Sequence, residues 1–134
     1  SEGAEARFGK LLAPYLQDKD NLFVVSSDFC HWGNRFNFTL HDSRFSEIHQ
    51  SVEALDRLGM DLIEAQDAVG FAAYLNQYKN TICGRHPIAV LLHALNACAA
   101  QITHQLKFVR YAQSSQCRHP SDSSVSYASA IVWI

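Results

Sequence analysis

The spacing of hydrophobic residues predicts two amphipathic helices in the first half of the chain. Residues 4–16 carry an apolar stripe at helical spacing, and Pro14 should bend or shorten that helix. A second helical stripe follows Asp42 and Ser43, which offer an N-cap, and Gly59 is expected to end it. The apolar positions of the two stripes are Phe8, Leu11, Leu12, Tyr15 and Leu16, and then Phe45, Ile48, Val52 and Leu55.

Two further helices are expected in the second half. One begins near Asp67, and the other follows a loop over residues 80–87, where Pro87 suits the first turn of a helix. Their inward-facing positions are Phe71, Leu75 and Tyr78, and then Ile88, Leu91, Leu92 and Leu95.

Three apolar runs predict strands. Leu22–Val25 has no alternation of polar and apolar residues, which is typical of a strand buried on both faces of a parallel sheet. Two later strands are expected around Leu106–Ala112 and Val125–Trp133. Strands interspersed with helices indicate an α/β domain with a mixed or parallel sheet flanked by helices.

Length and composition narrow the class of protein. The chain has 134 residues, enough for one domain, and 48% of them are hydrophobic, as expected of a globular core. A net charge of -2 provides no basic field for a nucleic-acid backbone. The apolar runs are too short to span a bilayer, and residues 1–10 do not resemble a secretory signal. We therefore expect a cytoplasmic protein, with its four scattered cysteines reduced.

The first segment with candidate chemistry is residues 26–33, which directly follow the first predicted strand. Ligands of open α/β sheets bind beyond the carboxyl ends of the strands. The Asp28 carboxylate could orient the His31 imidazole and leave its other nitrogen as a base or ligand. The alternative is structural, with Asp28 capping the turn and His31 bonded to the backbone. Cys30 is expected to point into the core.

The second segment is residues 80–87, at the start of the last predicted helix. Cys83 lies near the helix N-terminus and beside Arg85 and His86, which favours the thiolate that binds metals. Gly84 would let the backbone approach a ligand closely. The structural alternative is a small residue that fills a tight loop. Cys98, in contrast, falls on an apolar stripe and is expected to be buried.

Four motifs in order resemble the Memo (mediator of cell motility) family, and they match its C-terminal half. They are Val24–Gly33, Asn80–Pro87, Tyr111–Arg118 and Asp122–Ala128. Since members of that family are about twice this long, we expect residues 1–134 to be the C-terminal portion of a single Memo-like domain.

The resemblance implies a fold similar to that of class III extradiol dioxygenases, in which two histidines and a carboxylate hold non-haem iron. In Memo proteins a cysteine replaces the carboxylate. That cysteine matches Cys83, the acid/base histidine matches His31, and Asp28 lies in the same pocket. A thiolate favours copper and other thiophilic metals, and iron binding is also described for the family. The resemblance places the two ligand histidines in the N-terminal half, which is missing here.

The resemblance leaves three functions to weigh. The first is a cytosolic protein that binds copper or iron in redox and cell-motility signalling. The second is an adaptor for phosphotyrosine peptides of receptor tyrosine kinases and for cytoskeletal regulators, with His31, Trp32, Cys83 and Arg85 contacting the peptide and Arg35 nearby. The third, an active extradiol dioxygenase, rests on fold analogy alone. Without the N-terminal half as a partner, we expect exposed strand edges and apolar faces to make the chain associate or misfold.

Overall fold

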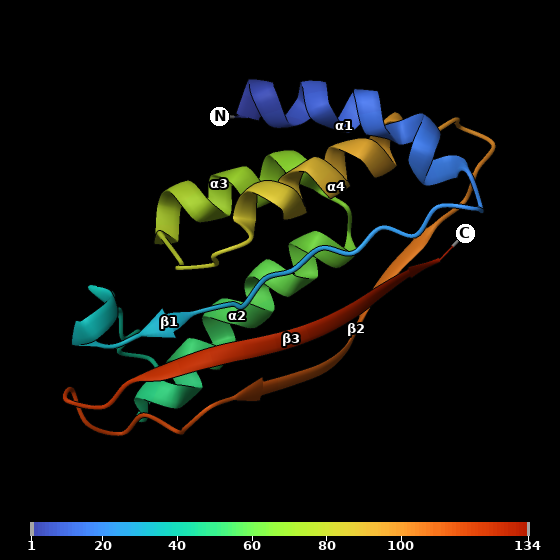
Figure 1. Cartoon of the computed structure of the whole chain (residues 1–134). Coiled ribbons are helices and arrows are strands. Elements are labelled where there is room, and N and C mark those ends of the chain that lie inside the picture. Colours follow the sequence, from blue (N-terminus) through green and yellow to red (C-terminus); the bar gives the residue numbers. More distant parts are fainter. Residues whose placement is uncertain (1, 134) are drawn as a thin grey trace.

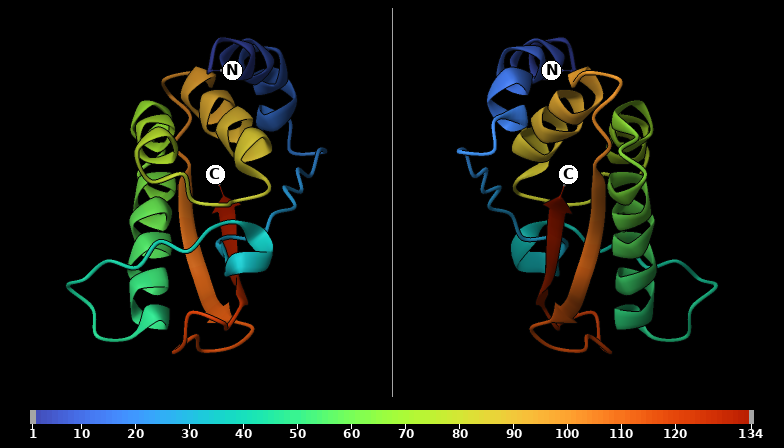
Figure 2. Two further views of the ribbon diagram at one scale, coloured as in Figure 1. Left: turned by 90° about the vertical axis from the view of Figure 1, so that its left-hand side faces the viewer. Right: turned by 90° about the vertical axis from the view of Figure 1, so that its right-hand side faces the viewer.

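The computed structural model describes residues 2–133, which form α-helices and a small sheet (Figure 1). In chain order the elements are α1 (Glu2–Gln17), β1 (His31–Trp32), the 3₁₀ helix η1 (Asn34–Phe36), α2 (Ile48–Glu64), α3 (Ala68–Tyr78), α4 (Arg85–Ala97), β2 (Gln105–Gln113) and β3 (Ser124–Trp133). In both views of Figure 2 the long β2–β3 hairpin lies between α2 and the extended chain that follows α1. The mixture of helices and strands agrees with the predicted α/β class.

The sheet is antiparallel throughout the described residues, which corrects the expectation of parallel strands. Its strand order is β1-β3-β2, and β3 pairs antiparallel with both neighbours. β2 and β3 confirm the two strands predicted in the last third of the chain. Their register shifts between Phe108 and Arg110, which marks a β-bulge. Because a hairpin brings sequential strands together, no crossover helix is needed between them.

The strand predicted at Leu22–Val25 does not form. Residues 21–28 belong to no strand, and the segment bonds β3 only at its end, where Phe29 and Cys30 contact the Ser126 backbone. The side chains of Leu22 and Val24 are 87% and 82% exposed. Phe23 and Val25 alternate with them and are half-buried, so only one face of the segment packs on the core. The apolar run therefore reflects a segment with one covered face, since Phe23 and Val25 are half-buried and Leu22 and Val24 are exposed.

Helix α2 differs from prediction at both ends. It begins at Ile48 with Glu47 as its N-cap in a capping box with Gln50, because the Asp42 carboxylate already binds Arg44. It also continues through Gly59, where an added Cβ would lie 2.9 Å from the Tyr74 hydroxyl oxygen. Gly59 therefore serves close packing rather than helix termination.

The remaining helices agree with the sequence. The Asp67 side chain accepts a hydrogen bond from the Gly70 amide and caps α3, and Pro87 lies in the first turn of α4. Helix α1 contains Pro14 and packs beside α4. Phe8, Leu11 and Tyr15 of its apolar stripe are exposed. No helix of the described residues is long and apolar enough to cross a membrane.

Two hydrophobic clusters hold the fold together. The larger one lies among α2, α3, α4 and the hairpin, with Phe71, Ile82 and Leu92 fully buried at its centre. The smaller one surrounds Trp32 and Val52, and it packs against the segment that leads to β1. Beside the larger cluster lies an apolar groove of about 640 Å³, whose lining includes exposed side chains of the extended segment and of β3.

Candidate metal centre

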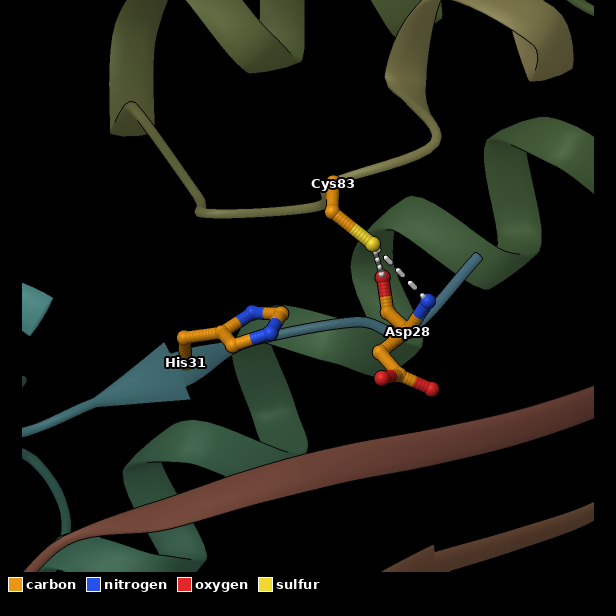
Figure 3. Close-up of side chains that lie close together, drawn as sticks. All are labelled: Asp28, His31 and Cys83. Atoms are coloured by element: carbon orange, nitrogen blue, oxygen red, sulfur yellow. Dashed lines mark hydrogen bonds between the residues drawn. The ribbon is translucent and has the colours of Figure 1, made fainter. Parts of the chain in front are cut away.

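Two segments far apart in sequence meet at the start of β1. Asp28 and His31 come from the extended chain after α1, and Cys83 comes from the loop between α3 and α4 (Figure 3). The sequence predicted chemistry in each segment separately, and the structure brings the two together.

Hydrogen bonds that involve side chains join the two segments in place of a β-ladder. The Asp28 amide donates to Cys83 Sγ at 3.2 Å, and the Gly84 amide donates to Ser27 Oγ at 2.9 Å. The Thr81 hydroxyl accepts from the His31 amide at 2.6 Å and donates to the His31 carbonyl at 3.0 Å. The position of Cys83 relative to His31 is thus fixed by contacts on both sides of the site.

Gly84 makes the close approach of the two segments sterically feasible. A Cβ at this position would lie 2.4 Å from Ser27 Cβ and 2.7 Å from the Ser26 carbonyl oxygen. The sequence predicted a close approach of the Gly84 backbone to a ligand. The close approach that the structure shows is to the neighbouring segment.

The backbone orients the His31 imidazole. Its Nδ1 lies 2.9 Å from both the Phe29 and the Thr81 carbonyl oxygens. Since a carbonyl only accepts hydrogen bonds, Nδ1 is the donor in these contacts, and Nε2 is the nitrogen left to act as a base or ligand. Within residues 2–133 no hydrogen bond joins the Asp28 carboxylate to this ring, so two carbonyls perform the orienting role expected of Asp28.

Asp28, His31 and Cys83 form a compact group of donors. One ligand atom from each lies within 4.8 Å of the others, and the first two residues are half-buried while Cys83 is exposed. Metal–ligand bonds of about 2.0–2.3 Å place two donors on one ion about 3–4.5 Å apart. A thiolate, an imidazole nitrogen and a carboxylate at this spacing fit a transition-metal ion.

The other residues expected at a peptide site do not share one surface. Trp32 is 2% exposed, and its indole N–H donates to the Leu40 carbonyl at 2.8 Å. Its ring belongs to the smaller hydrophobic cluster, so the expected peptide contact at Trp32 is corrected. Arg85 is exposed and lines a separate cavity of about 470 Å³. Arg35 lies over the Phe36 ring.

All four cysteines are free thiols, as predicted. Cys30 and Cys117 are fully buried, and burial raises the pKa of the Cys30 thiol far above its ordinary value. Cys98 is only half-buried because α4 ends there, which corrects the expectation of a core residue. Cys83 is therefore the most exposed thiol of the chain.

Sequence reasoning missed two residues that support the site. Thr81 bonds both the amide and the carbonyl of His31, but a threonine in a polar loop gives no distinctive signal. Asp56 is fully buried and binds both segments of the site. It could have been noticed, since it is an acidic residue four positions after Val52 on the buried face of a helix.

With this geometry established, comparison with known proteins decides the family. A family model described as "Memo-like protein" matches residues 1–131. The chain belongs to this Memo-like family. It is 53% identical over 135 residues to Protein MEMO1 of Homo sapiens and 55% identical over 129 residues to Protein MEMO1 of Xenopus tropicalis. It is 42% identical over 130 residues to "Protein memo-1 homolog" of Caenorhabditis elegans.

These matches cover nearly all of this chain but less than half of each Memo-like relative. The alignments include 100%, 96% and 95% of the chain, against 46%, 43% and 37% of the human, frog and nematode proteins. The chain therefore spans about half the length of the relatives it matches.

Proposed function

We propose that this Memo-like chain contributes His31 and Cys83 to a site that binds a redox metal, copper or iron. Asp28 lies beside them as a third donor or as a proton acceptor. The observation that carries the proposal is the grouping of one ligand atom from each residue within 4.8 Å. The wider role would be in cytosolic redox and cell-motility signalling, as expected of the family.

Each donor has a distinct part in this proposal. Cys83 supplies a soft sulfur ligand, which favours copper and other thiophilic ions over purely oxygen-bound ones. The backbone carbonyls on Nδ1 hold His31 so that Nε2 is available as a ligand or as a proton carrier. Two further histidine ligands would come from the part of Memo-like proteins that this chain does not span. When bound, such a metal would supply one-electron chemistry.

The same proposal includes a dioxygenase-like fold with an altered pocket. In extradiol enzymes two histidines and a carboxylate hold ferrous iron and leave open positions for substrate and oxygen. With the Cys83 thiol in place of that carboxylate, we expect little or no cleavage of catechol rings.

Metal content tests the proposal. Elemental analysis would compare the native chain with Cys83→Ser and with Cys98→Ser, which removes a half-buried thiol at the end of α4. We expect copper or iron near one equivalent when the missing half is restored, retained by Cys98→Ser and lost both from Cys83→Ser and from residues 1–134 alone. Metal-free protein in every case, or uptake unchanged by Cys83→Ser, would refute a Cys83 site.

A phosphotyrosine-peptide site is the second candidate function. The observation that favours it is the cavity at the N-terminus of α4, which Arg85 and Lys79 line with donors suited to an anion, while His86 on the same lining bonds the Glu5 carboxylate at 2.6 Å. Titration with matched phosphorylated and unphosphorylated peptides tests it. We expect phosphorylation to strengthen binding at least tenfold, as for other charge-assisted contacts worth about 1.5–3 kcal/mol. Equal affinities, or binding unaffected by Arg85→Ala, would reject this candidate.

A further inference from the structure

Asp56 is a fully buried carboxylate at the centre of a hydrogen-bond network. It lies on α2 with 0% exposure. Its Oδ1 accepts from the Cys30 amide at 3.2 Å and from Asn80 Nδ2 at 3.0 Å, and its Oδ2 accepts from the Tyr111 hydroxyl at 2.7 Å. Such donors offset the desolvation of a carboxylate that would otherwise be very costly to bury.

Burial and hydrogen bonding act in opposite directions on the pKa of Asp56. Burial raises the pKa of the carboxyl group, and hydrogen bonds from Ser126, Asn80, Tyr111 and the Cys30 amide oppose that rise. The groups that bond Asp56 are therefore neutral donors.

The two bonds to Oδ1 come from the two segments that carry the candidate ligands. Cys30 directly precedes His31, and Asn80 lies three residues before Cys83. A single oxygen atom thus joins residues 50 positions apart, beside the pair of bonds between Thr81 and His31. We propose that Asp56 is a positioning residue that holds the His31 and Cys83 segments together through Oδ1. The metal-binding consequence rests on the function proposed above.

The structure separates this role from a general contribution to stability. Oδ1 contacts the site segments, whereas Oδ2 contacts Tyr111 of β2. Tyr111→Phe removes a bond to the same carboxylate and leaves both site contacts intact, so it is the matched control for Asn80→Ala. Asp56→Asn keeps a carbonyl oxygen able to accept both Oδ1 bonds and serves as the conservative rescue, while Asp56→Ala removes every contact.

The chemical shift of the Asp28 amide gives a readout that does not need metal. This N–H donates to Cys83 Sγ, so its shift reports whether the two segments touch. In the labelled chain, Cys83→Ala defines the shift of the broken contact. We expect Asp56→Ala and Asn80→Ala to move the Asp28 signal towards that value, and Asp56→Asn and Tyr111→Phe to keep it near the native position.

Cadmium titration of the chain joined to the missing half, followed by the thiolate charge-transfer absorption, measures the consequence for metal binding. We expect Asn80→Ala and Asp56→Ala to weaken cadmium binding about tenfold to a hundredfold, the usual effect of losing support behind a metal ligand. If Asp56→Ala does not fold, the comparison of Asn80→Ala with Tyr111→Phe decides.

The outcomes separate the two proposals. An unchanged Asp28 shift in Asp56→Ala and Asn80→Ala would overturn the positioning role, as would an equal movement in Tyr111→Phe. If the chain joined to the missing half binds no cadmium, the metal site is refuted, while the Asp28 shifts would still decide the role of Asp56.

Discussion

The end of the molecule that carries the candidate ligands contrasts with the open face, formed by the extended segment and the end of β3 around the apolar groove. At the site end, Trp32 and Asp56 are buried, and the network around them provides partners for their polar atoms. On the other face, apolar side chains point outward. Leu22, Ile131 and Trp133 are exposed there and line the same apolar groove.

This contrast shows that the site segments can be held in place although another face of the chain is left uncovered. The segments carrying His31 and Cys83 are fixed by contacts made entirely within this chain. The open face carries apolar side chains as a core does, but no described element covers it. Monomeric proteins rarely leave a large apolar patch exposed. The chain can therefore hold its candidate ligands in order while still exposing apolar side chains.

The largest effect on stability is expected from removing the buried Trp32 ring beside the candidate site. Trp32→Ala removes a side chain that is 2% exposed, and we expect the free energy of unfolding to fall by about 3–5 kcal/mol. Leu22→Ala on the open face should change it by about 0.5 kcal/mol or less. Denaturant unfolding measures both. Similar losses for the two variants would contradict the contrast.

A smaller effect is expected on self-association. Leu22→Asp places a charge on the open face, where the native leucine is 87% exposed and borders the apolar groove. We expect a larger monomer fraction in sedimentation experiments at equal concentration. Val69→Asp is the matched control, since Val69 is 68% exposed in the first turn of α3, outside the groove. If the control has the same effect, added charge rather than the open face explains the change.

The smallest effect is expected on the pH dependence of stability, from Asp122 in the loop between β2 and β3. Asp122 accepts hydrogen bonds from the Arg118 and His119 amides, and these bonds lower the pKa of its carboxyl group. A lowered folded-state pKa stabilises the protein above the ordinary Asp value, and that contribution is lost as pH falls below about 4. Thermal melts across this range should show a slightly weaker acid dependence in Asp122→Asn. If Asp122→Asn has the same pH dependence of thermal stability as the native chain, Asp122 does not contribute to that dependence.

Much of the fold was predictable because local patterns determine it. The hairpin strands alternate in burial, and α3 carries its own capping residue in Asp67. The strand predicted at Leu22–Val25 failed because a run of apolar residues does not show whether a neighbouring strand is present. Gly59 failed as a stop signal because the deciding contact, with Tyr74, comes from another helix.

The candidate ligands could be predicted from the sequence, but the contacts that hold them in place could not. Cys83 and His31 were found from residue type and neighbours, and the structure brings them together. The partners of His31 were not predictable, because backbone carbonyls have no sequence signature. Trp32 was misassigned because an aromatic residue in a polar stretch fits a surface or a core equally well, and only packing distinguishes them.

The bonds between Thr81 and His31 also bear on the order of folding. They connect positions 50 residues apart, and the intervening chain includes α2 and α3. Helices form from local contacts within microseconds, whereas closing a long loop carries an entropic cost that only later contacts repay. We expect the two helices to form first and the His31–Cys83 juxtaposition to appear late. Ligand binding at this site would then report the end of folding rather than its beginning.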